Sequence, residues 1–272
     1  MSVLAAVDRW DVPHVAAAVV AGGEVVERRG PTGRVFPLAS ISKPLTAWAM
    51  LIAVEEGTIR LDTAVGQPGC TLRHLLAHAG GYSFDGDEPI APPERTRIYS
   101  NTGWDLAAAA VADAADMPFA VYLREAVLEP LGMESSRLDG SPAKDVHGSV
   151  EDLLHFVAEL RDPRLLSGAT VADAFRPQYP RLSGIVPGVG RYEKCPWGLG
   201  FEVRDDKQPH WTGTRNSPRT VGHFGGSGTM FWLDPDHDVA VIALTDREFG
   251  PWALDAWPSL SDDALAAHGS VR

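Results

Sequence analysis

Hydrophobic and polar residues near both ends of the chain follow patterns typical of strands. Residues 12–20 and 24–29 predict two strands, and Ala21-Gly22-Gly23 between them is typical of a tight hairpin turn. Towards the other end, apolar runs predict four further strands, at residues 198–203, 220–224, 229–233 and 239–244. The sheet is therefore expected to draw on both ends of the chain.

The middle of the chain has helical periodicity instead. Between residues 40 and 57, Leu45, Trp48 and Ile52 recur at helical spacing, and Gly57 stands where a C-terminal cap is expected. Further helices are predicted at residues 102–115, 118–128 and 150–161, and a loop rich in Pro and Gly at 177–196. Strands at both ends around a helical middle predict an α/β (α+β) protein with a mostly helical insertion.

Composition and charge narrow the class of protein. Of 272 residues, 44% are apolar and 22% are charged, which is ordinary for a folded protein. A net charge of −12 disfavours nucleic acid or an anionic membrane as a partner. The apolar run 14–23 is too short to cross a bilayer, and no basic stretch precedes an apolar one near the N-terminus, so we expect a cytoplasmic enzyme.

Neither cysteines nor histidines indicate a metal site. Cys70 and Cys195 form no C-x-x-C pair; a disulfide between them is possible, but without an export signal we expect two reduced thiols. His74 and His78 stand four residues apart on a predicted helix, yet no glutamate follows His74 as a zinc-protease helix requires. We therefore expect no metal ion and no cofactor.

The sharpest chemical signal is Ser40-Ile41-Ser42-Lys43 at the start of a predicted helix. Ser40 and Lys43 lie on one face, about one turn apart. The N–H group of Ser40 belongs to the unpaired first turn and could stabilise an oxyanion, while the Lys43 amine could remove the hydroxyl proton in a desolvated site. Only four of the 24 basic residues are lysine, and arginine could not serve as this base.

The same spacing occurs a second time, in Ser141-Pro142-Ala143-Lys144. This copy lies between predicted helices, and no amphipathic run follows it. We predict a solvated loop without catalytic function, so the second copy serves as an internal control for the first.

Two further motifs could complete a catalytic site. In Tyr99-Ser100-Asn101, a phenol beside an ammonium group has its ionisation favoured, so Tyr99 could be a general base or proton shuttle, and Asn101 could donate its amide to a substrate carbonyl. Taken alone, this motif is more typical of a half-buried tyrosine and a helix cap. The glycine-rich segment 222–229 could let a substrate approach closely or could simply be a hairpin turn.

The order of these motifs resembles that of the penicillin-recognising serine hydrolases. The branch that it resembles holds class C β-lactamases, Streptomyces-type D-Ala-D-Ala carboxypeptidases and related esterases. Supporting stretches are Phe36-Pro-Leu-Ala-Ser40, Leu72-Arg-His-Leu-Leu-Ala-His78 with Gly80-Gly81, Pro130-Leu-Gly-Met133 and Trp197-Gly-Leu-Gly-Phe201. The resemblance implies a β-lactamase/transpeptidase-like fold, an antiparallel sheet from both chain ends flanked by helices.

This resemblance also implies how the chain is divided. We expect a single catalytic unit over residues 1–272. Its sheet subdomain is expected at about 1–60 plus 197–272, and its helical subdomain at about 61–196.

The resemblance further implies a role for each motif residue. Ser40 would be the nucleophile, Lys43 its activating partner and Tyr99 the residue that passes protons to the leaving group. The N–H groups of Ser40 and Gly226 would form the oxyanion hole. The residues expected to bind substrate are Asn101, His223, Phe224 and Gly225.

Two departures from the family pattern bear on substrate. Phe224 stands where penicillin-binding members carry a threonine that hydrogen-bonds a carboxylate, and no export signal is visible. Both favour an esterase-like hydrolase of small ester, amide or lactam substrates. The alternatives are a β-lactamase, D-alanyl carboxypeptidase or D-aminopeptidase, and a non-turnover penicillin- or ligand-binding protein. The rim of the site is expected to come from loops 82–96, 177–196 and 204–220.

Overall fold

A six-stranded antiparallel sheet forms the centre of the molecule, which is known from a computed structural model that describes residues 2–270. Its strand order is β2-β1-β11-β10-β9-β8. The strands are β1 (Val15–Ala21), β2 (Glu24–Arg29), β8 (Glu202–Val203), β9 (Val221–Gly225), β10 (Thr229–Asp234) and β11 (Val239–Thr245). Because β1 pairs with β11, the two ends of the chain meet inside the sheet. The predicted fold class is confirmed.

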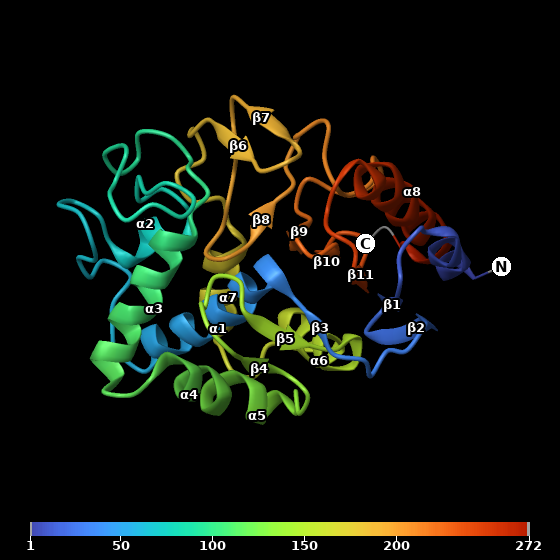
Figure 1. Ribbon diagram of the computed structural model, residues 1–272, viewed down its shortest axis with the longest axis horizontal. Coiled ribbons are helices and arrows are strands. Elements are labelled where there is room, and N and C mark those ends of the chain that lie inside the picture. Colours follow the sequence, from blue (N-terminus) through green and yellow to red (C-terminus); the bar gives the residue numbers. More distant parts are fainter. Residues whose placement is uncertain (1, 271–272) are drawn as a thin grey trace.

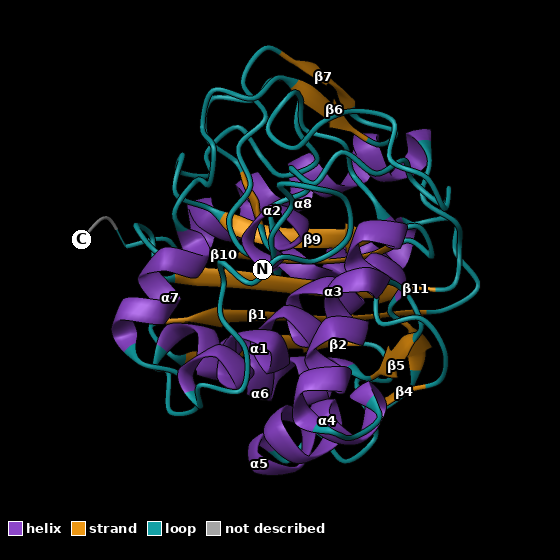
Figure 2. Ribbon diagram, turned by 90° about the vertical axis from the view of Figure 1, so that its left-hand side faces the viewer, coloured by secondary structure: helices purple, strands orange, loops and turns teal. Residues whose placement is uncertain are grey.

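The two faces of the sheet are covered by different helices, and β1 shows how its sequence serves both. Ala17 and Val19 belong to the core shared with α8 (Pro251–His268) and the 3-10 helix η1 (Val3–Arg9). Ala16 and Ala18 face the other core, shared with α1 (Ser42–Glu55) and α6 (Val150–Arg161). Figure 1 shows η1 beside α8 at one end of the molecule, and Figure 2 shows the strands stacked behind α1 and α6.

Helix α1 is the central helix of the protein. Twelve of its residues are buried, as expected for a helix surrounded by other elements. It follows directly after a short 3-10 turn, η2 (Ala39–Ile41), and Pro44 lies in its first turn, where a missing N–H group is tolerated. The predicted helix is confirmed, but α1 begins at Ser42, and Ser40 lies in the 3-10 turn before it.

The middle of the chain forms a helical region beside the sheet. Its elements are α2 (Leu72–Leu76), α3 (Asn101–Ala115), α4 (Phe119–Leu123), the π-helical turn η3 (Arg124–Leu128), α5 (Glu129–Leu131) and α7 (Gly168–Phe175). The small strands are β3 (Phe36–Pro37), β4 (Arg137–Leu138), β5 (Val146–Gly148), β6 (Gly184–Val186) and β7 (Gly190–Tyr192). The predicted loop 177–196 thus contains a short hairpin, β6–β7, at the top of Figure 1.

One strand of the sheet and the last helix differ most clearly from the sequence prediction. The strand predicted at 198–203 is reduced to β8, because the chain turns at Gly200, whose φ is +93° and whose added Cβ would lie 2.3 Å from the Cβ of Ala47. Helix α8 was not predicted, although Ala253, Trp257 and Leu260 are buried at helical spacing. Pro258 stands inside α8, and an interior proline is ordinarily evidence against a helix.

Among the described residues, no single helix is long and apolar enough to cross a membrane. One bent pair, Asn101–Ala115 with Phe119–Leu131, passes the test of length and composition together, with a bend of 84°. The buried residues of this pair, such as Trp104 and Leu123, pack into the main core of the protein.

Candidate active site

Ser40 lies in a turn that the sheet holds in place. The residue before it, Ala39, has a φ of +48°, a left-handed conformation that a non-glycine residue rarely adopts. The C=O of Leu38 accepts a hydrogen bond from Thr229 Oγ1 of β10 at 2.9 Å. An added Cβ on Gly225 of β9 would lie only 2.4 Å from that same oxygen. Gly225 therefore brings β9 against the backbone of the Ser40 turn; we had expected it to admit a substrate.

Lys43 is fully buried below Ser40. Its Nζ donates hydrogen bonds to Asn101 Oδ1 at 2.7 Å and to the C=O of Ala143 at 3.0 Å, and it lies 3.5 Å from Ser40 Oγ. Burial lowers the pKa of Lys43 to about 7, against the opposing charge of Asp105. A lysine with this pKa is partly neutral near pH 7, so it can take the proton of Ser40 as a general base.

The second Ser-x-x-Lys copy lies in a turn, as predicted, but it is only partly exposed to solvent. Ala143 is buried, and its C=O accepts a hydrogen bond from Lys43. Segment 141–146 therefore packs against the buried side chain of Lys43. Ser141 Oγ donates to Asp105 Oδ1 at 2.6 Å. The loop prediction is confirmed, but the burial of Ala143 was not predicted, because a contact across 100 positions is invisible to local pattern.

Tyr99 and His223 face each other above Lys43. The Tyr99 hydroxyl lies 3.4 Å from His223 Nε2, and His223 Nδ1 lies 2.7 Å from the C=O of Phe224. Because a carbonyl only accepts, Nδ1 carries the hydrogen and Nε2 accepts from the phenol. Burial and the charge of Lys43 lower the pKa of His223 to about 3, so its ring is neutral.

The ionisation of Tyr99 differs from our expectation. Burial raises its pKa well above the ordinary value, although Ser40 donates a hydrogen bond that favours the phenolate. The Nζ atom of Lys43 lies over the ring, 4.5 Å from its centroid, but burial is the largest influence on the pKa of Tyr99. Tyr99 is therefore a neutral phenol, suited to pass a proton rather than to begin as a phenolate base.

Asn101 is engaged at both ends of its amide. Its Oδ1 accepts from Lys43, and its Nδ2 donates to Asp85 Oδ1 at 2.9 Å. We had expected this amide to donate to a substrate carbonyl. Asp85 did not stand out in the sequence, since nothing local links it to a residue 16 positions away.

A cavity of about 240 Å³ opens in front of Ser40. It is lined by Ser40, Phe84, Tyr99, Val186, Pro187, Gly188, Trp197, His223, Phe224, Gly226 and Phe249. The rings of Phe224 and Phe249 pack with their centroids 4.5 Å apart. Among the described residues that line the cavity, none is Lys or Arg. Ser40 and Gly226, whose N–H groups are expected to form the oxyanion hole, both line this cavity.

The motif residues thus divide into two groups. The structure brings five of them to one cavity, namely Ser40, Tyr99, His223, Phe224 and Gly226. Lys43, Asn101 and Gly225 lie behind this surface and contact its residues instead.

A family model described as Beta-lactamase matches residues 5–265 of the chain. This chain belongs to the beta-lactamase family. The resemblance drawn from the three ordered motifs is confirmed, and it extends over nearly the whole sequence.

Three relatives show the range of this family. A solved structure from Mycobacterium bovis, described as a beta-lactamase, is 47% identical, with a TM-score of 0.97 over 99% of this chain and 100% of that one. A penicillin-binding protein of Bacillus subtilis (strain 168) is 29% identical over 83% of this chain, and the match spans 64% of that protein. Esterase EstB of Burkholderia gladioli is 24% identical over 86% of each protein.

The rim of this beta-lactamase family site comes from the expected loops in unequal shares. Loop 82–96 contributes Phe84 and loop 177–196 contributes Val186 and its neighbours. Loop 204–220 contributes no lining residue; its Trp211 packs behind Phe224, with ring centroids 5.5 Å apart. The sequence did not indicate Phe249, which closes the far side of the cavity.

The two histidines considered as metal ligands, His74 and His78, have structural roles. His74 contacts Thr71 and Glu94, and His78 accepts from the N–H of Ser100 at 3.2 Å. His78 lies beyond the end of α2, with a φ of +54°, so our placement of both histidines on one helix was wrong. Over residues 2–270, no group of three or more metal-ligating side chains was found.

Both cysteines are buried and free, as expected. Burial raises the pKa of the Cys70 thiol to about 11, so this thiol is unreactive near neutral pH.

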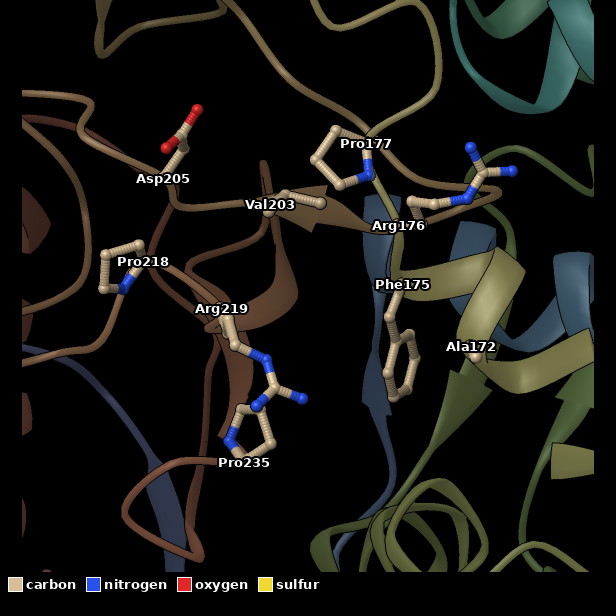
Figure 3. Close-up of a pocket in the computed structure, with 9 residues that line it drawn as sticks. All are labelled: Ala172, Phe175, Arg176, Pro177, Val203, Asp205, Pro218, Arg219 and Pro235. Carbon is tan, nitrogen blue, oxygen red and sulfur yellow. The ribbon is translucent and has the colours of Figure 1, made fainter. Parts of the chain in front are cut away.

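A larger cavity of about 420 Å³ lies away from Ser40, between α7 and β8 (Figure 3). Its two arginines already have carboxylate partners: Arg176 pairs with Asp173, and Arg219 with Asp236 at 2.8 Å. The cavity shares no lining residue with the site at Ser40.

Proposed function

We propose that this beta-lactamase family member is a serine hydrolase that forms an acyl-enzyme on Ser40 and prefers small, uncharged acyl esters. The observation that carries this proposal is the position of Ser40, over a buried lysine and at the base of a mostly apolar cavity of about 240 Å³. The cavity has the size and lining of a small-ligand site.

The contacts support a simple order of proton transfers. Neutral Lys43 takes the proton of Ser40 while Oγ bonds to the substrate carbonyl carbon. The N–H groups of Ser40 and Gly226 stabilise the oxyanion. As the ester bond breaks, the proton on Lys43 is relayed through the neutral Tyr99 hydroxyl to the departing alcohol oxygen. Water then attacks the acyl carbon, with the same groups handling its proton.

The lining of the cavity supports an uncharged substrate. Phe224 presents a ring where a carboxylate would need a hydrogen-bond donor, and His223 is neutral. A carboxylate left unpaired against such a surface costs a few kcal/mol, or roughly a hundredfold in kcat/KM. Esterase EstB, a relative over 86% of this chain, carries the same activity in its name.

β-Lactam hydrolysis is the second candidate function. It is supported by the 47% identity to the structure described as a beta-lactamase. The carboxylate of a β-lactam would have to avoid Phe224 and lie towards the open side of the cavity for this activity to be efficient.

One set of assays tests both candidates. A neutral fluorophosphonate should phosphonylate Ser40 with loss of fluoride, and absence of this adduct would exclude the acyl-enzyme mechanism. Short p-nitrophenyl esters should then be hydrolysed at least about tenfold more efficiently than a chromogenic cephalosporin. The reverse order would establish β-lactam hydrolysis, and a single stoichiometric burst without turnover would indicate a penicillin- or ligand-binding protein.

A further inference from the structure

Hydrogen bonds fasten the rim loop at Asp85 to the start of α3, and three of them are 2.9 Å or shorter. The C=O of Phe84 accepts from the N–H of Asn101 at 2.7 Å, and the C=O of Ser83 accepts from Ser100 Oγ at 2.6 Å. The third bond runs from Asn101 Nδ2 to Asp85 Oδ1 at 2.9 Å. The Asp85 side chain is 55% exposed, while the backbone of the two residues before it is bonded to the start of α3.

The partners of Asn101 permit only one orientation of its amide. A carboxylate only accepts and an ammonium only donates, so Nδ2 must face Asp85 and Oδ1 must face Lys43. Asn101 is 3% exposed, and an unpaired amide there would be costly. The carboxylate of Asp85 therefore decides which end of the amide Lys43 meets.

Lys144 is a second neighbour of the Asp85 carboxylate. Its Nζ lies 3.8 Å from Asp85 Oδ1, and the C=O of the preceding residue, Ala143, accepts from Lys43. The pair is exposed, so it contributes little to stability. Its two charges of opposite sign nevertheless both lie close to the catalytic lysine.

We infer that Asp85 is a positioning and specificity-determining residue: it turns the Asn101 amide oxygen towards Lys43 and withholds the amide N–H₂ group from substrates with an acylamino group. Asp85 and Lys144 also act in opposite directions on the charge of Lys43. This inference rests on the proposed function. By occupying the N–H₂ group of Asn101, Asp85 favours plain acyl esters over acylamino esters, whose extra carbonyl would otherwise bind that group.

The sign of the charge effect follows from the groups around Lys43. Those that face it are His78, Asp85, Tyr99, Asp105, Lys144 and His223. Burial keeps the two histidines and the phenol neutral. Asp85 and Asp105 raise the pKa of Lys43, and Lys144 lowers it. Removing Asp85 should therefore release the proton of Lys43 at lower pH, and removing Lys144 at higher pH.

The first test follows the rate of Ser40 labelling by a neutral fluorophosphonate against pH. The acid limb is the part of the pH profile where the labelling rate falls as Lys43 becomes protonated. In Asp85→Asn this limb should move down by roughly half a pH unit, and in Lys144→Gln it should move up by a similar amount. Asp87→Asn removes the same charge from the same exposed loop and should leave the limb in place. Equal shifts in the two aspartate variants, or shifts of one sign in Asp85→Asn and Lys144→Gln, would overturn the charge effect.

The second test separates the hydrogen bond from the charge. Asp85→Asn keeps an oxygen that accepts from Asn101, whereas Asp85→Ala frees the donor. The ratio of kcat/KM for an N-acetylalanine p-nitrophenyl ester to that for p-nitrophenyl butyrate should rise about tenfold in Asp85→Ala and stay unchanged in Asp85→Asn. An unchanged ratio in Asp85→Ala would overturn the specificity role.

The two proposals fail differently. If the wild-type protein is not labelled at Ser40, the proposed hydrolase is excluded. If Ser40 is labelled but neither the limb nor the ratio moves in the variants, only the role of Asp85 is excluded.

Discussion

The two Ser-x-x-Lys segments share a spacing and differ in everything around it. Lys43 is completely buried, while the Lys144 side chain is 47% exposed. Ser40 opens onto a cavity, whereas Ser141 Oγ is taken up by Asp105. Reactivity therefore comes from burial at the start of a core helix, not from the spacing. The second segment still matters, because it supplies the carbonyl that holds Lys43.

The largest difference in activity is expected between the alanine variants of the two serines. Ser40→Ala should lower kcat/KM for a p-nitrophenyl ester by at least about a thousandfold, since no other group forms the acyl-enzyme. Ser141→Ala should keep activity within a few-fold and lose about 1 kcal/mol of unfolding free energy with its hydrogen bond to Asp105. Steady-state kinetics and urea unfolding measure both, and a large loss of activity in Ser141→Ala would reverse the comparison.

The two lysines should differ almost as strongly. Lys43→Arg keeps the positive charge but cannot lose its proton, so kcat/KM should fall by roughly a hundredfold or more. Lys144→Arg retains its exposed charge and should be nearly neutral. Thermal melting shows whether Lys43→Arg is folded, and a folded, active Lys43→Arg would exclude lysine as the base.

The pH dependence of the unmodified protein gives a smaller effect. Lys43 must be deprotonated, so kcat/KM should fall about tenfold per pH unit below the pKa of about 7. Because the pKa of His223 is about 3, this histidine should add no second limb between pH 5 and 8. A pH–rate profile checks this, and a rate that rises towards pH 5 would contradict the role of Lys43.

The smallest effect concerns the backbone contact between β9 and the turn before Ser40. Gly225→Ala would place a Cβ 2.4 Å from the C=O of Leu38, so the backbone must shift, at a cost of about 2 kcal/mol in unfolding free energy. Gly168→Ala meets nothing within 4 Å and provides the matched control. Urea unfolding compares the two; equal stabilities would mean that β9 does not fix the turn before Ser40.

The sequence predicted what local pattern and motif order can encode. The helix behind Ser40, the strands at both chain ends and the meeting of Tyr99 with His223 all follow from patterns within a few residues, or from a family order. Asp85, Phe249 and the contact at Ala143 could not be found in this way, because each reaches the site across a long stretch of chain.

The protonation states of Tyr99 and Lys43 could not be predicted from the sequence either. The spacing suggested that a neighbouring ammonium group would favour the phenolate of Tyr99, whereas burial determines the outcome. Burial likewise lowers the pKa of Lys43, and only the fold shows that this side chain is fully enclosed. The pattern thus identified residues that the structure brings together around Ser40, but not all of their protonation states.

The pairing of β1 with β11 has a consequence for biosynthesis. Val15 pairs with Thr245, so on the ribosome the first strand waits for its central partner until most of the chain has been made. At ordinary translation rates this delay is on the order of tens of seconds. During that time the apolar strand β1 is available to chaperones, and the sheet on which the Ser40 turn rests is unfinished. A nascent chain that stops before β11 should therefore have no functional nucleophile.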